Sequence, residues 1–281
     1  MGNTLAESWL YATVLVENQN GAKGTGFLVR RTIDEEKARI FLVTNKHVIA
    51  ESQEARARVE KFNLHLNVKD PNGKLRGETV SVIVHGTTRP DLWLQLHREH
   101  PDPDVDVLAF DVTALIIAKV GIANKWSDYS LFASREKLDE LDVTIGDDVM
   151  VIGYPLGLRH RETNFPLFRS GVISTKIGET LEDEVRDPKG VMRKRTLRGF
   201  LVDGAMIPGS SGSPVVLKPI FGRKVKNTIM GSLPVPVLLG IMAETRYAPV
   251  QAGYGDSWSY AGLGLAFDAE TVKETIELFF K

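Results

Sequence analysis

Short stretches of strand-forming residues, separated by turns, run along most of this 281-residue sequence and constrain its fold more than any other feature. Apolar, β-branched and aromatic residues bounded by glycine, proline and small polar residues are typical of strands. In the first part of the chain they predict strands over 9–16, 26–29, 40–44, 62–68, 80–84, 92–96 and 105–110. Later they predict strands over 149–152, 171–175, 199–202, 214–217, 237–242 and 263–266. This many short strands predicts an all-β protein built from barrels.

Between the two groups of strands the pattern changes over 115–141 to a partly polar, helix-compatible stretch, which predicts a connector. Near the C-terminus, apolar residues at 272, 276, 279 and 280 have the spacing of one helix face, with Asp268 as the N-cap. We therefore predict a first β-barrel at 1–118, a connector at 119–147, a second β-barrel at 148–267 and a C-terminal helix at 268–281.

The composition supports a packed core and excludes several functions. Hydrophobic residues make up 43% of the chain, which is ample for a core at this length. The formal net charge of -1 provides no overall field for nucleic acid or an anionic membrane, so we expect neither as a partner. The absence of cysteine excludes disulfides, zinc–thiolate sites and a thiol nucleophile, and it suits a reducing compartment.

The N-terminal residues show no basic region followed by an apolar stretch, as a secretory signal would. No run approaches the roughly 18 apolar residues needed to span a bilayer. We therefore expect a cytoplasmic protein.

Residues 209–214, Gly-Ser-Ser-Gly-Ser-Pro, place a serine between small residues directly before an apolar strand. A serine hydroxyl attacks only when a base takes its proton, and preorganised backbone N–H groups must meet the oxyanion that forms. Small neighbours leave room for both, which makes Ser211 a candidate nucleophile. The alternative interpretation is a plain turn between strands.

The apolar run 41–43 leads into a polar turn that contains His47. An imidazole titrates near neutral pH, so it can act as general base and then as general acid. Among the other histidines, His65 lies in an alternating strand, whereas His97 and His100 lie in a charged turn. Ordinary structural or surface roles suit those three better, and His47 is the candidate base.

An acidic loop over 100–106 enters the apolar run 107–110. A carboxylate at such a junction can be buried enough to hold a histidine Nδ1 proton and fix the tautomer. Asp106 is the best candidate because the apolar run begins immediately after it, and Asp104 is the alternative. The spacing of Asp102, Asp104 and Asp106 also suggests a calcium loop. However, no glycine follows Asp106, no glutamate stands at the twelfth position, and Pro103 stiffens the loop.

Seven motifs follow one another along the chain: Gly-Thr-Gly-Phe-Leu-Val at 24–29, Thr-Asn-Lys-His-Val-Ile at 44–49, Asp-Val-Leu-Ala at 106–109, Gly-Tyr-Pro-Leu-Gly at 153–157, Ser-Gly-Val-Ile-Ser at 170–174, Asp-Gly-Ala-Met-Ile-Pro-Gly-Ser-Ser-Gly-Ser-Pro at 203–214 and Gly-Leu-Gly-Leu-Ala-Phe at 262–267. In these motifs the sequence resembles the trypsin-like serine proteases, and within them it is most similar to the HtrA (Deg) protease domain. The order His47, Asp106, Ser211 is the chymotrypsin order of the catalytic triad.

This resemblance implies two six-stranded antiparallel β-barrels of the chymotrypsin fold, with the site in the cleft between them. It implies a serine endopeptidase in which His47 deprotonates Ser211, and Asp106 orients and stabilises the imidazolium. The backbone N–H groups of Gly209 and Ser211 would form the oxyanion hole. Water then hydrolyses the acyl-enzyme, so no metal or other cofactor is required. The expected partner is a protein or peptide substrate, and the sequence is compatible with an oligomer.

Some positions depart from the family pattern. Ser213 replaces the second glycine after the nucleophile, and Ser210 replaces the aspartate that pairs with a newly cleaved N-terminal amine in digestive members. No Ile-Val-Gly-Gly start occurs either, so activation by N-terminal cleavage is not expected. The chain ends soon after the predicted second barrel, so we expect no PDZ domain of the kind that often follows in HtrA proteins.

Small and apolar residues at 204–207 and 240–243 form the expected substrate pocket, with Asp203 as the only charge nearby. We predict that Ala205, Ile207, Ile241 and Met242 contact the substrate and that the residue before the cleaved bond is small or medium-sized and apolar. In HtrA-like sequences the residue that matches Asp203 is usually structural, which argues against a pocket for basic residues.

A second hypothesis is a protease-fold binding or scaffold protein whose triad is present but not assembled. The long polar insertion 176–198 supports it, although a solvated loop is the preferred interpretation of that charge run. A third hypothesis, a glycine-rich nucleotide site at 21–26, is weak because no helix follows and the phosphate-loop spacing is absent.

Overall fold

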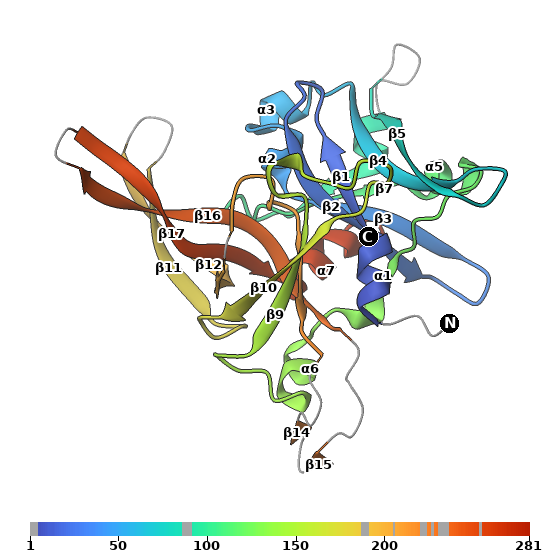
Figure 1. The fold of residues 1–281 in the computed structure, drawn as a ribbon. Helices are drawn as coiled ribbons and strands as arrows, with labels where there is room; N and C mark the ends of the chain where they lie inside the picture. Colours follow the sequence, from blue (N-terminus) through green and yellow to red (C-terminus); the bar gives the residue numbers. More distant parts are fainter. Residues whose placement is uncertain are drawn as a thin grey trace.

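The computed structural model describes residues 5–85, 92–186, 191–204, 206–219, 224–225, 228–229, 236–252 and 255–281. Its strands form two large sheets, one from each half of the chain, which pack against each other (Figure 1). Pairing is antiparallel throughout both sheets, apart from one short parallel contact. The predicted all-β architecture of the chymotrypsin type is confirmed.

The first sheet runs in the order β5-β4-β1-β2-β3-β7-β6, and β8 pairs with β2 in parallel. Its strands are β1 (Thr13–Glu17), β2 (Lys23–Thr32), β3 (Ala38–Thr44), β4 (Lys61–Lys69), β5 (Leu75–Ile83), β6 (His97–Glu99), β7 (Leu108–Asp111) and β8 (Ser127–Asp128). The short strand β8 falls within the predicted connector, so part of that segment belongs to the first sheet.

The second sheet runs in the order β10-β9-β13-β16-β17-β12-β11. Its strands are β9 (Asp148–Gly153), β10 (Leu167–Ile173), β11 (Thr180–Arg186), β12 (Met192–Asp203), β13 (Pro214–Leu217), β16 (Leu238–Ala252) and β17 (Gly255–Asp268). An additional pairing of β10 with β12 closes six of these strands into a ring and leaves β11 outside it. The separate pair β14 (Lys224–Val225) and β15 (Thr228–Ile229) completes the described strands.

Short helices connect the strands and cover the barrel ends. The helices are α1 (Leu5–Ala12), α2 (Lys46–Ile49), α3 (Gln53–Arg56), α4 (Leu92–Leu96), α5 (Thr113–Ala118), α6 (Arg135–Glu140) and α7 (Ala269–Glu277), with 3-10 turns at η1 (Tyr129–Leu131) and η2 (Pro155–Gly157). The predicted C-terminal helix forms as α7, and the Asp268 side chain accepts the Thr271 N–H at its start. None of the helices in the described part of the chain is long and apolar enough to cross a membrane.

The central strands β2 and β3 are buried on both faces, because successive side chains of a strand point to opposite sides. Leu28 and Leu42 belong to the core of the first barrel. Phe27 and Phe41 belong to an apolar cluster that continues into the second barrel. The same two strands therefore build one barrel and form the surface on which the other packs.

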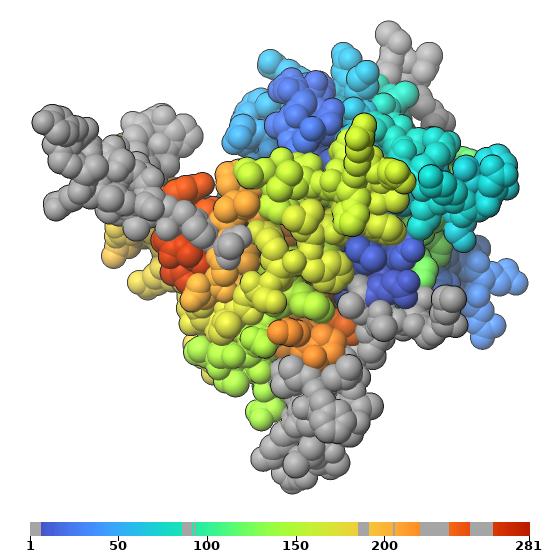
Figure 2. Space-filling view, viewed as in Figure 1, coloured from blue at the N-terminus to red at the C-terminus, as the bar shows by residue number. Residues whose placement is uncertain are grey.

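A polar segment also joins the two halves. Residues after β9 reach across the first sheet, where Asn164 N–H donates to the Asn67 side chain at 2.8 Å and the Asn164 side chain donates to the Leu66 carbonyl at 2.8 Å. Gly77 N–H donates to the Glu162 carbonyl at 2.8 Å. This segment is the yellow-green surface that covers the cyan strands in Figure 2.

One strand prediction is wrong throughout and two are wrong in part. Residues 9–12 complete helix α1, and only the β-branched part from Thr13 onward is strand β1. Residues 92–96 form helix α4 and not a strand. The prediction failed because an apolar run this short does not distinguish a helical turn from a strand. Val105 lies in a turn before β7, and its N–H bonds to the Asp102 carbonyl at 3.2 Å, not to a neighbouring strand.

The expectation of a solvated loop at 176–198 is also wrong. Residues 180–186 and 192–198 pair as a regular antiparallel hairpin of β11 and β12. Strand β12 continues into the ring of the second barrel, where it pairs with β17. The hairpin therefore extends directly from the barrel wall, as Figure 1 shows.

We expect Phe41→Ala to lower the free energy of unfolding by about 3–5 kcal/mol, because it empties a fully buried site between the barrels. Chemical denaturation measures this loss. Ile117→Ala is the control, since Ile117 is 75% exposed and its truncation should change stability by less than about 0.5 kcal/mol. Equal effects of the two substitutions would contradict the assignment of Phe41 to the interface core.

Candidate active site

His47 lies in the single helical turn α2, which follows β3 after a one-residue link. Buried Val48 and Ile49 anchor this turn against the first barrel. Asn45, which links the two elements, does not cap the helix with its side chain, because the side-chain amide donates to the Asp106 carbonyl at 2.6 Å. The local sequence thus places His47 beside the loop that carries Asp106.

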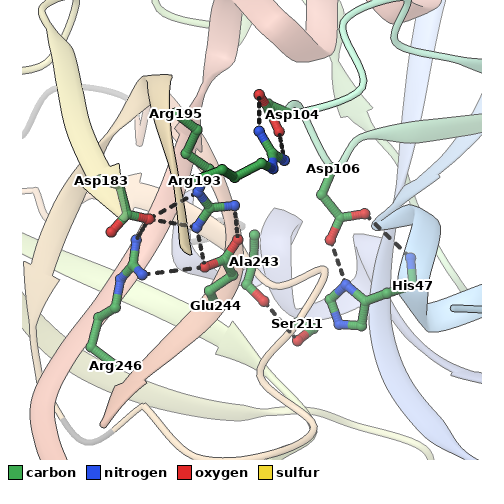
Figure 3. Close-up of polar contacts among 10 residues, drawn as sticks. All are labelled: His47, Asp104, Asp106, Asp183, Arg193, Arg195, Ser211, Ala243, Glu244 and Arg246. Atoms are coloured by element: carbon green, nitrogen blue, oxygen red, sulfur yellow. Dashed lines mark hydrogen bonds and ion pairs between the residues drawn. The ribbon is translucent and has the colours of Figure 1, made fainter. Parts of the chain in front are cut away.

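The Asp106 carboxylate contacts His47 with both oxygens (Figure 3). One oxygen forms a short hydrogen bond with Nδ1 of the ring, and the other accepts the His47 backbone N–H at 3.2 Å. With Nδ1–H directed at the carboxylate, the lone pair of Nε2 faces away from Asp106 and can accept a proton.

Each group of this pair stabilises the charged form of the other. Burial lowers the pKa of His47, but the hydrogen bond and charge of Asp106 outweigh it, so the pKa lies above its ordinary value. Burial raises the pKa of Asp106, but its hydrogen bonds and the charge of His47 outweigh this, so the pKa lies below its ordinary value. The pair therefore favours an ionised carboxylate next to an imidazole that accepts protons readily.

Asp104, the alternative carboxylate, faces another partner. It accepts hydrogen bonds from both terminal nitrogens of the Arg193 guanidinium, one of them at 3.1 Å. Of the two candidates, the structure thus brings only Asp106 to His47. The calcium-loop interpretation also finds no support, because the described residues contain no group of three or more His, Cys, Asp or Glu able to hold a metal ion.

Ser211 lies in a tight turn in which two glycines adopt left-handed backbone angles, Gly209 with φ 87° and Gly212 with φ 85°. A Cβ atom at Gly212 would lie 1.7 Å from the Thr25 carbonyl oxygen, and one at Gly209 would lie 2.4 Å from the Tyr154 carbonyl oxygen. A side chain at Gly212 would push the turn away from strand β2 of the first barrel, and one at Gly209 would push it away from the segment that follows β9.

The Ser211 hydroxyl donates a hydrogen bond to the Ala243 carbonyl at 3.0 Å. A β-bulge between Met242 and Glu244 takes Ala243 out of the pairing with β17 and turns its carbonyl toward the serine. No hydrogen bond joins Ser211 to His47, both of which the structure describes, and in Figure 3 the Ser211 hydroxyl is directed to the Ala243 carbonyl. Of the three candidate residues, His47 and Asp106 are thus hydrogen-bonded to each other, whereas Ser211 is bonded to Ala243.

Two backbone N–H groups of the serine turn have no described acceptor. The carbonyls of Gly209 and Ser211 accept hydrogen bonds from the side chain and the N–H of Thr25, at 2.9 and 2.8 Å. Neither the Gly209 N–H nor the Ser211 N–H donates to any residue that the structure describes. Two N–H groups near one hydroxyl are the donors that a developing oxyanion needs.

The predicted pocket residues differ in exposure. Ile207 is half-buried, Ile241 and Met242 are buried, and Ala205 lies outside the described residues. Met206, which belongs to the predicted pocket wall at 204–207 but is not one of the four predicted contact residues, is fully buried beside Gly264. A Cβ atom added to that glycine would lie 2.7 Å from Met206 Cγ and 2.8 Å from Met242 Sδ. Two methionines therefore fill the space over this glycine. Asp203 is exposed at the end of β12.

An ion-pair cluster lies next to this site (Figure 3). Half-buried Arg195 binds Asp183 at 2.6 Å and Glu244 at 2.7 Å, and Arg246 binds the same two carboxylates at 2.8 and 3.5 Å. The cluster joins β11, β12 and β16. Because Glu244 follows Ala243 directly, the cluster also fixes the backbone that accepts the Ser211 hydrogen bond.

The glycine-rich segment 21–26 is not a nucleotide loop. Gly24 and Gly26 lie within strand β2, and a Cβ at either position would collide with Val48 or Leu42 at 2.7–2.8 Å. These glycines allow close packing inside the first barrel.

Comparison with known proteins defines the class. The trypsin-like peptidase domain matches residues 24–218, a span that contains His47, Asp106 and Ser211. The chain therefore belongs to the trypsin-like peptidase family. No curated protein sequence matches it.

Solved structures similar to this chain include two forms of one protease and a further protein. An inactive form of the Rv3671c protease is 17% identical with a TM-score of 0.46, and the match covers 99% of this chain and 94% of that one. The active form of the M. tuberculosis Rv3671c protease is 16% identical with a TM-score of 0.48, covering 98% and 83%. HBP is 12% identical with a TM-score of 0.45, covering 96% and 91%.

We expect the His47 imidazole to titrate above the ordinary value of about 6.5. The folded state then binds the proton more tightly than the unfolded chain, so this contribution to stability is complete below the ordinary value and is lost as pH rises through the folded value. Asp106→Asn should lower the midpoint, because burial remains while the opposing charge is removed.

Nuclear magnetic resonance titration of the ring protons measures both midpoints. Asp104→Asn is the control from the same loop, and it should leave the His47 midpoint unchanged, since Asp104 contacts Arg193. A midpoint that is unaffected by Asp106→Asn would contradict the proposed coupling.

Proposed function

We propose that this trypsin-like peptidase is a serine endopeptidase that works through His47, Asp106 and Ser211 with an acyl-enzyme intermediate. The observation that carries the proposal is the imidazole bound to a carboxylate through Nδ1, next to a serine turn with two N–H groups that have no described acceptor. Base, nucleophile and oxyanion donors are the three elements that acyl transfer requires.

The reaction begins when the Ser211 hydroxyl turns from the Ala243 carbonyl to Nε2 of His47 by rotation about its Cα–Cβ bond. His47 takes the hydroxyl proton as Oγ attacks the peptide carbonyl, and Asp106 stabilises the imidazolium. The Gly209 and Ser211 N–H groups stabilise the oxyanion. The imidazolium then gives its proton to the leaving amine. In the second stage His47 takes a proton from water as the water oxygen attacks the acyl carbonyl, and it returns that proton to Ser211 Oγ as the ester bond breaks.

Within the family we propose an HtrA-like protease domain, supported by the motifs at 24–29, 44–49 and 203–214. Hydrogen bonds connect these three motifs in the structure. Thr25 in the first motif bonds the serine turn through its N–H and its hydroxyl, and Thr44 in the second donates to the Thr25 carbonyl at 2.7 Å.

We further propose a preference for a small or medium-sized apolar residue before the cleaved bond. Met206 and Met242 are buried and fill the space over Gly264, which supports a short apolar pocket. Since Asp203 is exposed at the end of its strand, it supplies no buried negative charge for an arginine or lysine.

A binding or scaffold protein is the second candidate. It is supported by the hydrogen bond of Ser211 to Ala243, which holds the hydroxyl away from the base. The two candidates differ in one property: a scaffold needs no reactive serine.

We expect a fluorophosphonate probe to label the wild-type protein and to leave Ser211→Ala unlabelled, because the probe reacts only with an activated serine. Intact-protein mass spectrometry measures the adduct. Ser210→Ala is the neighbouring control and should still label, because the Ser210 hydroxyl bonds to the Ile207 carbonyl at 2.5 Å and to Arg169 at 2.9 Å, and not to His47. An unlabelled wild-type protein would favour the scaffold.

We expect peptides with alanine or valine before the cleaved bond to have higher kcat/KM values than matched peptides with arginine or lysine. Met206→Ala should raise the ratio of kcat/KM for phenylalanine over alanine by about tenfold, since it opens space beside Gly264. Faster cleavage after arginine or lysine by the wild-type enzyme would refute the proposed preference.

A further inference from the structure

A buried lysine precedes the candidate base directly in the chain. Lys46 is only 7% exposed, and its ammonium donates hydrogen bonds to the backbone carbonyls of His100 at 3.0 Å and Asp102 at 3.2 Å. None of the carboxylates in the described ranges lies within 4.0 Å of this ammonium. Burying a charged lysine without an adjacent carboxylate costs folding free energy, so the hydrogen bonds that Lys46 makes must offset this cost.

The two carbonyls belong to the segment that carries Asp106. Between the end of β6 at Glu99 and the start of β7 at Leu108, the chain is held mainly by isolated hydrogen bonds. The Asp102 carbonyl accepts both the Val105 N–H at 3.2 Å and the Lys46 ammonium. Lys46 thus anchors the turn from which Asp106 extends.

Lys46 and Asn45 contact this segment from the His47 side. The Asn45 side chain holds the Asp106 carbonyl, and the Lys46 ammonium holds the turn a few residues earlier. Both flank His47 in one short element, so any displacement of the turn would change the distance from Asp106 to the ring. An ammonium has three N–H donors and can hold two carbonyls at once, which an apolar side chain of similar length cannot do.

Charged groups from several elements surround the ammonium. Burial lowers the pKa of Lys46, while the charges of Glu99, Asp106 and Asp102 oppose that effect and Arg56 adds to it. Arg56 is itself paired with Glu99 in a two-bond contact at 2.7 and 2.8 Å. The acidic groups thus help to keep the buried amine protonated.

We propose that Lys46 is a positioning residue for the triad: its ammonium holds the 100–106 turn so that the Asp106 carboxylate meets Nδ1 and the backbone N–H of His47. This inference rests on the proposed function, but the contact that Lys46 is proposed to control is the one between Asp106 and His47 alone. Other contacts retain the segment without Lys46, since His100 bonds Glu274 at 2.9 Å and Asp104 bonds Arg193. Loss of the ammonium should therefore shift the turn and leave it folded.

The test compares Lys46→Met, which keeps the chain length and removes the donor, with Lys46→Arg, which restores a cation. We expect Lys46→Met to lower kcat by about 10–100-fold with KM changed less than about twofold, because a misplacement near 1 Å costs about this much. Lys46→Arg should recover part of the loss. Lys119→Met, which removes an ion pair with Glu78 elsewhere in the first barrel, should leave kcat unchanged.

The His47 titration separates a positioning role from a merely structural one. Lys46→Met should move the midpoint downward, because the contact with Asp106 is weakened, whereas Lys119→Met should not. An unchanged midpoint and kcat in Lys46→Met, or a lower melting temperature with an unchanged midpoint, would overturn the proposal. If Lys46→Met does not fold, Lys46→Leu, which also lacks a donor, is measured by the same criteria.

Failure of the proposed function has a different signature. If the wild-type protein neither hydrolyses peptides nor reacts with the fluorophosphonate probe, the endopeptidase proposal fails. The titration still decides the role of Lys46 in that case, because the Asp106–His47 contact exists without catalysis. A lowered His47 midpoint in Lys46→Met then supports the positioning role, and an unchanged one overturns it.

Discussion

Thr25 makes the hydrogen bonds on which the arrangement of the two barrels around the site depends. It lies in β2, and its N–H and hydroxyl bond the Ser211 turn, while its carbonyl accepts the Thr44 hydroxyl three residues before His47. Its hydroxyl oxygen also accepts the Tyr154 N–H at 3.1 Å. Because the surrounding strands are buried on both faces, these bonds form in a dry environment where leaving them unmade would be costly. One residue of the first barrel therefore sets the position of the Ser211 turn of the second.

The site is assembled by side-chain contacts as much as by strand pairing. The segment that carries Asp106 depends on Lys46, Asn45 and Arg193, and the backbone at Ala243 depends on the ion pairs of Glu244. Hydrogen-bonded charged contacts of this kind are directional, so they can specify geometry where the fold alone would allow variation. Because separate contacts hold the Asp106 segment and the Ala243 backbone, Ser211 can bond to the Ala243 carbonyl while His47 and Asp106 are paired.

Local patterns predicted the barrel strands well where a run was long or rich in β-branched residues, as in β3, β4 and β13. They failed at 92–96, where five residues are too few to distinguish a turn of helix from a strand. They also failed at 176–198, where charges suggested a solvated loop. There, strand pairing and ion pairs such as Arg195 with Asp183 and Glu244 stabilise a hairpin, and no local pattern reveals partners so far away.

The sequence by itself determined the chemistry that is available: a histidine after a strand, a carboxylate before one and a serine between glycines, because each of these is a local pattern. It also identified the family through motifs distributed from Gly24 to Phe267. Only the tertiary structure decided that Asp106 meets His47 while Asp104 meets Arg193, that Ser211 bonds Ala243, and that Lys46 is buried. Those outcomes depend on distances between segments remote in the chain, and such distances follow from how the two barrels pack.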